Sequence, residues 1–129
     1  MSQSTTLILL PQTTYGANVA NSNPYTVTGN SQPAAAYYIA NRDLQTVNIN
    51  LASVTGNIVI EATLASSPGS GDWFKVLDIE ANANGAANSA PLLASNASAY
   101  TNIEGNFVYI RAKVVDFAAG IVNFVKLSY

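Results

Sequence analysis

The chain has 129 residues, of which only 9% are charged, and its formal net charge is −2. An average soluble domain carries roughly 25% charged residues, so this surface must consist mainly of Asn, Ser, Thr, Ala and Gly. The few basic residues form no patch of the kind that binds nucleic acid. Without Cys or His, the chain also lacks disulfides, thiolate and imidazole metal ligands, and the commonest catalytic base. We therefore expect a single domain, residues 1–129, that is not an enzyme and uses no cofactor.

The N-terminal part has weak strand signals separated by prolines. Strands are predicted at residues 5–10, 25–28 and 35–40. The apolar run at residues 7–10 has no basic flank and is too short for a signal peptide or a membrane span. We expect the N-terminus to dock on its own domain or on a neighbouring molecule. We interpret residues 1–14 as a docking arm, with Leu7, Leu9 and Leu10 as interface residues. Deleting residues 1–12 would then weaken assembly and leave the fold intact.

Two segments in the middle of the chain alternate apolar and polar side chains. This period of two is typical of a strand with one buried face. It places Val47, Ile49 and Leu51 on one face of residues 46–51, and it continues through residues 57–65. A turn is predicted at residues 53–56. A second turn is predicted at residues 66–71, which are rich in Ser, Pro and Gly, and residues 72–81 form the returning strand.

Residues 82–99 are rich in Ala and Asn. The alanines favour a helix, but Asn82, Gly85 and Pro91 oppose one, so we interpret the segment as a long loop. Short strand-like pieces around Leu92 and Leu93 are the alternative. A loop of this length is typically functional or covered by a partner, which makes Leu92 and Leu93 further candidate interface residues.

The longest strand signal lies at residues 107–117, where Ile110, Ala112 and Val114 share one face. Tyr109 lies on the other face and is a candidate interface residue. A tight connection at residues 118–120 with a positive φ at Gly120 would close a hairpin with residues 121–129. About eight short strands result. They predict an all-β antiparallel sandwich that is jelly-roll-like, although an immunoglobulin-like strand order shares the same pattern.

Few residues have the spacing that catalysis or metal binding requires. Asp78 and Glu80 share a strand face, but calcium loops gather more oxygen ligands than this, and we interpret both as solvent-facing. Glu61 and Glu104 could act as a hydrolase pair only if the fold brought them together. We predict no metal site.

Three aromatic residues offer an alternative function. Trp73, Tyr37 and Tyr38 could form a stacking platform for a glycan, which would make the domain a carbohydrate-binding or receptor-recognition module. Such amphipathic rings also suit protein interfaces. The glycan interpretation requires Trp73 to be exposed.

The scarcity of charge favours assembly. A surface of Asn, Ser, Thr and Ala can be buried against other copies at a small desolvation cost, and contacts of this kind are little weakened by salt. We therefore expect a homo-oligomer, with a trimer as the preferred state.

Two further segments carry a resemblance to a known group of proteins. They are residues 56–76, GNIVIEATLASSPGSGDWFKV, and residues 105–129, GNFVYIRAKVVDFAAGIVNFVKLSY. The I-E-x-T-L strand, the Pro/Gly turn and the D-W-F strand of the first, and the G-N-F and R-A strand of the second, resemble small virion structural proteins of tailed bacteriophages, particularly marine and cyanobacterial phages.

This resemblance implies a jelly-roll-like, non-catalytic subunit on the virion, assembled in the host cytoplasm, serving as a capsid decoration, head-fibre, neck or tail component. Its partners would be copies of itself and other virion proteins, with no nucleic acid or membrane. Trp73 and Phe74 would anchor a hairpin in the core, and Arg111 would support the sheet or an interface.

Overall fold

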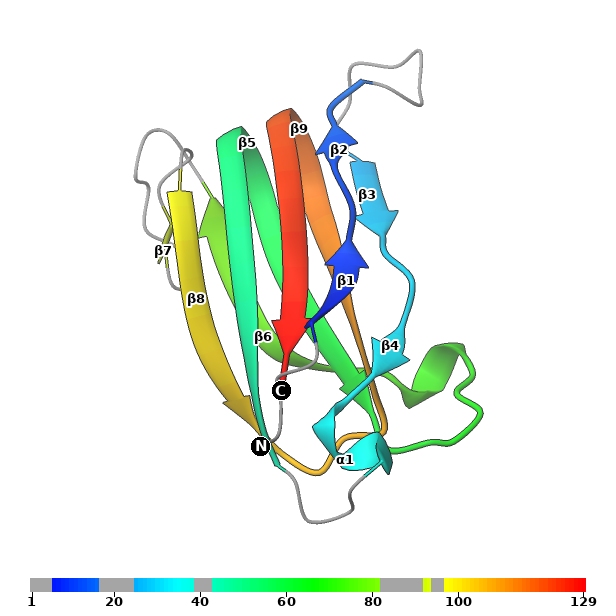
Figure 1. Ribbon diagram of the computed structural model, residues 1–129. Helices are drawn as coiled ribbons and strands as arrows, with labels where there is room; N and C mark the ends of the chain where they lie inside the picture. Colours follow the sequence, from blue (N-terminus) through cyan, green and yellow to red (C-terminus); the bar gives the residue numbers. More distant parts are fainter. Residues whose placement is uncertain (1–5, 17–24, 39–42, 82–91, 94–96) are drawn as a thin grey trace.

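The computed structural model is almost entirely antiparallel β-sheet (Figure 1), which confirms the all-β prediction. It describes residues 6–16, 25–38, 43–81, 92–93 and 97–129. The strands are β1 (Thr6–Leu10), β2 (Thr13–Thr14), β3 (Tyr25–Thr28), β4 (Gln32–Pro33), β5 (Leu44–Thr63), β6 (Phe74–Ala81), β7 (Leu92–Leu93), β8 (Ala97–Glu104) and β9 (Tyr109–Ser128). One helical turn, α1 (Ala35–Tyr38), and one 3-10 turn, η1 (Ser70–Asp72), complete the elements.

Two strands of 20 residues each, β5 and β9, organise the sheet. They pair antiparallel from Thr46 opposite Ser128 to Thr63 opposite Tyr109. Both strands bend near their middle, so each passes from one layer of a sandwich into the other. In Figure 1 the first half of β5 and the second half of β9 lie in front, and their other halves lie behind.

The strand order of the two layers is that of a jelly roll. The first layer contains β8, the first half of β5, the second half of β9, and β1. The second contains β6, the second half of β5, the first half of β9, and β3. All these neighbours are antiparallel. Counting the halves of β5 and β9 separately, the two layers hold eight strand segments, as expected for this fold.

Irregular residues at the bends keep the apolar side chains on the inner face. The ladder shifts register between Ala52 and Asn57, and positive φ angles occur at Ser53 (57°), Asp116 (53°) and Gly120 (92°). An extra residue in a strand reverses which face the following side chains occupy. The core therefore continues across both bends. Its fully buried members include Leu9, Val47, Ile49, Val54, Ile58, Ile60, Ile110, Val114, Phe117, Val125 and Leu127.

The turn predicted at residues 53–56 and the hairpin predicted for residues 121–129 require correction. The chain changes direction at both places, and Gly120 does adopt a positive φ. However, residues 109–115 and 121–128 do not pair with each other. Both pair with β5 instead. Each predicted turn is therefore a bend within a continuous strand.

The strand predicted at residues 35–40 is wrong, because Ala35–Tyr38 forms the helical turn α1. The buried side chain of Gln45 explains this local structure. Its Oε1 accepts a hydrogen bond from the Ala35 backbone N–H at 3.0 Å, which satisfies a donor at the start of the turn. Its Nε2 donates to the backbone oxygens of Asp43, Ile103 and Gly105.

The loop predicted at residues 82–99 is corrected at its C-terminal end. Residues from Ala97 onward belong to β8, which pairs with β5 along its whole length. Leu92 and Leu93 form β7, a short parallel partner of β6. This confirms the alternative interpretation of a short strand at these residues. Residues 82–91 and 94–96 lie outside the described residues.

The N-terminal docking arm is also corrected. β1 is a strand of the domain's own first layer, paired with β9. Leu9 and Leu10 are buried in the core, and Leu7 is half-buried against it. Deleting residues 1–12 would therefore remove core side chains instead of leaving the fold intact.

The layers approach closely where β1 passes the segment after β3. A Cβ atom added to Gly29 would lie 1.9 Å from the Leu9 carbonyl oxygen. Gly29→Ala is therefore expected to lower the free energy of unfolding by about 1–3 kcal/mol or more, measured by urea denaturation. Gly71→Ala is the control, because nothing lies within 4 Å of the added atom. Equal stability of the two variants would contradict this close approach.

Replacing Gln45 tests the buried amide. Gln45→Met keeps the side-chain length but leaves the Ala35 N–H and the carbonyls of Ile103 and Gly105 without this partner. We expect a loss of about 1–3 kcal/mol in unfolding free energy by thermal or urea denaturation. Gln12→Met, at an exposed position, should change stability by less than about 0.5 kcal/mol. A fully stable Gln45→Met protein would refute the role of Gln45.

Candidate functional site

The outer face of the second layer concentrates the chain's charge. It carries seven of the twelve charged residues: Glu61, Lys75, Asp78, Glu80, Arg111, Lys113 and Asp116. A shallow groove of about 320 Å³ opens among them. We call it the charged groove, and its lining consists of Asn57, Val59, Glu61, Lys75, Asp78, Lys113, Val115 and Asp116.

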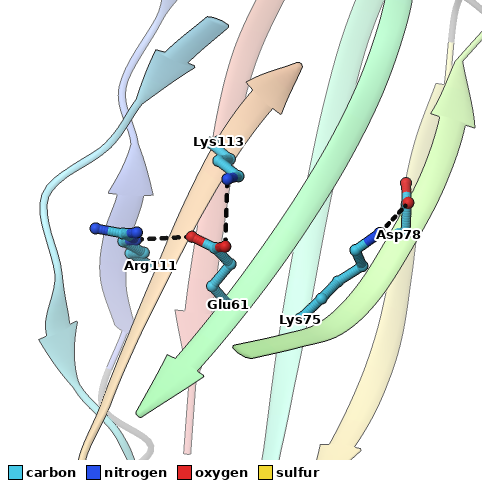
Figure 2. Close-up of polar contacts among 5 residues, drawn as sticks. All are labelled: Glu61, Lys75, Asp78, Arg111 and Lys113. Carbon is cyan, nitrogen blue, oxygen red and sulfur yellow. Dashed lines mark hydrogen bonds and ion pairs between the residues drawn. The ribbon is translucent and has the colours of Figure 1, made fainter. Parts of the chain in front are cut away.

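Two ion-paired groups form the polar wall of this groove. Figure 2 shows Glu61 on β5 between two cations of β9: Arg111 Nε at 2.8 Å and Lys113 Nζ at 3.2 Å. On β6, Lys75 Nζ lies 2.9 Å from Asp78 Oδ2, and Asn57 Nδ2 donates to Asp78 Oδ1 at 3.0 Å. Three adjacent strands therefore supply the groove with alternating donors and acceptors.

The ion pairs shift the acidity of both carboxyl groups. Partial burial acts to raise the pKa of Glu61, but the hydrogen bonds and positive charges of Arg111 and Lys113 outweigh it and hold this pKa below its ordinary value. At Asp78, partial burial likewise acts to raise the pKa. The hydrogen bonds from Lys75 and Asn57 and the positive charge of Lys75 outweigh it, so this pKa is also lowered. Both groups are therefore carboxylates at neutral pH.

A row of aromatic contacts continues along the same face of β9. Tyr109, Arg111 and Lys113 occupy alternate positions and so share this face. The Tyr37 ring contacts the Tyr109 ring, with centroids 5.3 Å apart, and the Arg111 guanidinium lies 4.2 Å from the Trp73 ring centroid. Trp73 is half-buried and Tyr37 is exposed. The aromatic row thus joins the charged groove at Arg111.

The outer face of the first layer has the opposite character. The strand register places thirteen partly or fully exposed side chains on it, of which only Lys126 and Glu104 are charged, with opposite signs. We call this surface the neutral face. Its residues are Thr6, Ile8, Leu44, Thr46, Asn48, Asn50, Ser98, Tyr100, Asn102, Glu104, Phe124, Lys126 and Ser128.

Several of these side chains are held by contacts within the neutral face. Thr46 Oγ1 donates to Asn102 Oδ1 at 2.8 Å, and Lys126 Nζ lies 4.2 Å from the Phe124 ring centroid. Ile8 and Tyr100 are 46% and 75% exposed, and both lie in the row that also contains Lys126 and Asn48. The neutral face therefore combines ordered polar groups with exposed apolar surface.

The structure separates the candidate interface residues. Leu7 is half-buried, and Leu9 and Leu10 are core residues, as described above. Leu92 and Leu93 lie in β7, but their side chains fall outside the described part of the structure. Tyr109 is half-buried beside Tyr37. The proposed interface residues therefore do not form one surface.

The aromatic candidates come together only in part. Trp73 and Tyr37 lie on one face, linked through Arg111 and Tyr109. Tyr38 belongs to α1, but its side chain is not among those described. The expectation that Trp73 anchors a hairpin in the core is wrong, since it packs on Arg111. Phe74, 40% exposed, contacts the buried Phe107 at a centroid distance of 5.8 Å.

The carboxylate candidates do not form a catalytic pair. Glu61 lies on the second layer, whereas Glu104 is at the end of β8 in the first layer. Asp78 and Glu80 are not the solvated pair that was expected, because Asp78 is ion-paired and Glu80 is only 5% exposed. Among the described residues, no group of three Asp, Glu, His or Cys side chains is arranged to hold a metal ion.

The sequence did not predict either the charged groove or the neutral face as a continuous surface. The groove combines residues of β5, β6 and β9 that are up to 59 positions apart, from Asn57 to Asp116. The neutral face depends on β8, which was not predicted as a strand. The sequence signal for β8 was the alternation in residues 100–104, where Thr101 and Ile103 are separated by Asn102 and followed by Glu104.

Comparisons with known proteins place no constraint on the function: no protein-family model, no curated protein and no solved structure matches the chain. In the described ranges, neither helical segment has the length and apolar character needed to cross a membrane.

The Glu61 ion pairs predict a pH dependence of stability. Because the folded-state pKa lies below the ordinary value of about 4.3, the pairs stabilise the fold above that pH. This contribution is lost as the pH falls through the folded-state pKa. Glu61→Gln should therefore be less stable than the unaltered chain by about 1 kcal/mol near pH 7.

Urea denaturation of both proteins at about pH 7 and about pH 3 checks this prediction. The difference between them should shrink at the lower pH, where Glu61 becomes protonated and resembles Gln. A difference that stays constant between the two pH values would show that the ion pairs do not cause it.

Proposed function

We propose that the protein is a non-enzymatic structural subunit of a phage virion that binds copies of itself and other virion proteins through the neutral face. The observation that carries this proposal is the composition of that face. Two charged residues among thirteen, Lys126 and Glu104, leave little charge to desolvate when the face is covered. Tyr100 and Ile8 supply exposed apolar area at two of its edges.

The order of the neutral face also favours binding. Side chains already held by the Thr46–Asn102 hydrogen bond and the Lys126–Phe124 contact lose less conformational freedom when a partner covers them. Association is then less costly than it would be for a surface of long, mobile Lys and Glu side chains.

The size of the neutral face limits the strength of a single contact. Four strands at about 4.8 Å spacing make the face about 14 Å wide, and residues 44–50 of β5 make it about 20 Å long. The resulting area of about 300 Å² is smaller than one partner's share of a standard interface, about 800 Å². Self-association through this face alone is therefore expected to be modest, and other virion proteins would add contact area.

The phage assignment rests on the two resembling segments. Residues 56–76 span the second half of β5, the following turn and the start of β6, and residues 105–129 span β9. They thus cover β9 and the second half of β5 in the central ribbon of a jelly roll, an architecture found in viral capsid and lectin domains. Because fold alone does not determine function, the assignment needs its own test: mass spectrometry should detect the chain in phage particles purified from its source.

Light scattering coupled to gel filtration tests the self-association. The unaltered chain should form an oligomer whose mass persists at about 1 M salt, because neutral contacts are little screened. A dimer would indicate face-to-face packing, and a trimer a closed ring of unlike contacts. Tyr100→Lys, which places a charge in the neutral face, should shift the protein to monomer with at least a tenfold weaker Kd.

Leu64→Lys is the matched control. Leu64 is 65% exposed and lies outside the neutral face, so the substitution adds the same charge without touching the proposed contact. A monomeric unaltered chain at all concentrations, or equal dissociation by both variants, would contradict assembly through the neutral face.

A further inference from the structure

The charged groove is not used by the proposed assembly, since it lies on the other layer of the sandwich. Its volume of about 320 Å³ falls at the lower end of the range for small-molecule sites, roughly 300–1,000 Å³. Val59, only 4% exposed, and Val115 add apolar surface to its lining. It therefore has the mixed lining of polar groups and apolar patches that small-molecule sites share.

The charges of the groove balance one another. Its carboxylates are Glu61, Asp78 and Asp116, and the cations are Lys75, Lys113 and the adjoining Arg111. Glu61 and Asp78 are already paired with cations at 2.8–3.2 Å. All three cations belong to these pairs, so an anionic ligand would have to displace one of them. The groove therefore favours a ligand without negative charge.

The paired groups place donors directly beside acceptors. The ammonium of Lys75 and the amide of Asn57 both adjoin the Asp78 carboxylate, at 2.9 and 3.0 Å. Neighbouring hydroxyls of a sugar ring each donate one hydrogen bond and accept others. An ammonium–carboxylate pair can satisfy two such hydroxyls with charge-assisted bonds, which are stronger than neutral ones.

The aromatic row supplies the second element of a saccharide site. Alternate positions on β9 are about 7 Å apart, so Lys113, Arg111 and Tyr109 lead stepwise from the groove to the rings of Trp73 and Tyr37. The apolar C–H face of a sugar can pack on the exposed Tyr37 ring and on the part of the half-buried Trp73 ring that Arg111 leaves accessible. The groove and the rings lie on one surface, whereas Lys126 and Glu104 lie on the first layer.

We propose that the charged groove and the adjoining aromatic row bind a neutral saccharide, with Asp78, Lys75 and Asn57 bonding ring hydroxyls and Trp73 contacting a second sugar unit. This binding is independent of the neutral face, and it holds whether or not the protein assembles on a virion.

An array of neutral oligosaccharides of glucose, galactose, mannose and N-acetylglucosamine, with sialylated and sulfated oligosaccharides beside them, tests the proposal. We expect binding to one or more of the neutral probes and weaker binding to the anionic ones. The Kd of the best neutral probe is then measured by isothermal titration calorimetry.

Lys75→Ala and Trp73→Ala should each weaken that Kd about tenfold, as expected for the loss of about 1.4 kcal/mol. The Lys75 side chain is 57% exposed, so its truncation tests binding without endangering the fold. Lys126→Ala and Glu104→Ala are the matched controls on the first layer, and both should bind as the unaltered chain does.

Two outcomes overturn the proposal. One is the failure of every neutral probe to bind at millimolar concentration. The other is binding that Lys75→Ala and Trp73→Ala leave unchanged. Neither outcome affects the assembly proposal, which is tested separately by comparing the oligomer mass of the unaltered chain with that of Tyr100→Lys.

Discussion

The ladder between β5 and β9 is the constraint on which the rest of the structure depends. Each strand contributes to both layers, so every other strand except β7, which pairs with β6, is positioned by pairing with one half of this ribbon. The ribbon can bend only because both strands become irregular at the same place. Gly120 allows this: a Cβ there would lie 2.2 Å from the Ser53 carbonyl oxygen. Phe117, fully buried beside the bend, contacts the Tyr15 ring edge-on at 5.5 Å.

Much of the fold could be predicted because the alternation of apolar and polar residues along a strand indicates which side chains are buried. Val47, Ile49 and Leu51 are buried, as are Ile110, Ala112 and Val114. Bends were mistaken for turns because a positive φ at Gly120 suits either, and only the choice of partner strand decides between them. The residues Ala97–Ala99 have little strand preference and form β8 through their pairing with β5. The helical turn α1 is likewise set by Gln45, ten residues away.

The candidate surfaces were harder to predict, because they also depend on which strands pair. An apolar run such as Leu9 and Leu10 can serve the chain's own core or a partner's surface, and only β1 pairing with β9 shows which. Isolated charges such as Glu61, Lys75 and Lys113 have no local motif, yet the register of three strands brings them together. As a result, a chain with few charged residues has one face that holds more than half of them and another that is nearly neutral. Two ligands of different chemistry could then occupy the same small domain without competing.

The position of β9 in the sequence has a consequence for how the protein is made. Residues 109–128 form a central strand of both layers, and they bond to β1, more than a hundred residues earlier. Neither layer can be completed on the ribosome until this segment has been synthesised and has emerged. Until then β5 lacks its main partner, and its apolar side chains remain open to contact with other nascent chains. Such dominance of sequence-distant pairings is typical of domains that fold in milliseconds to seconds, so the domain is expected to fold only after β9 has emerged.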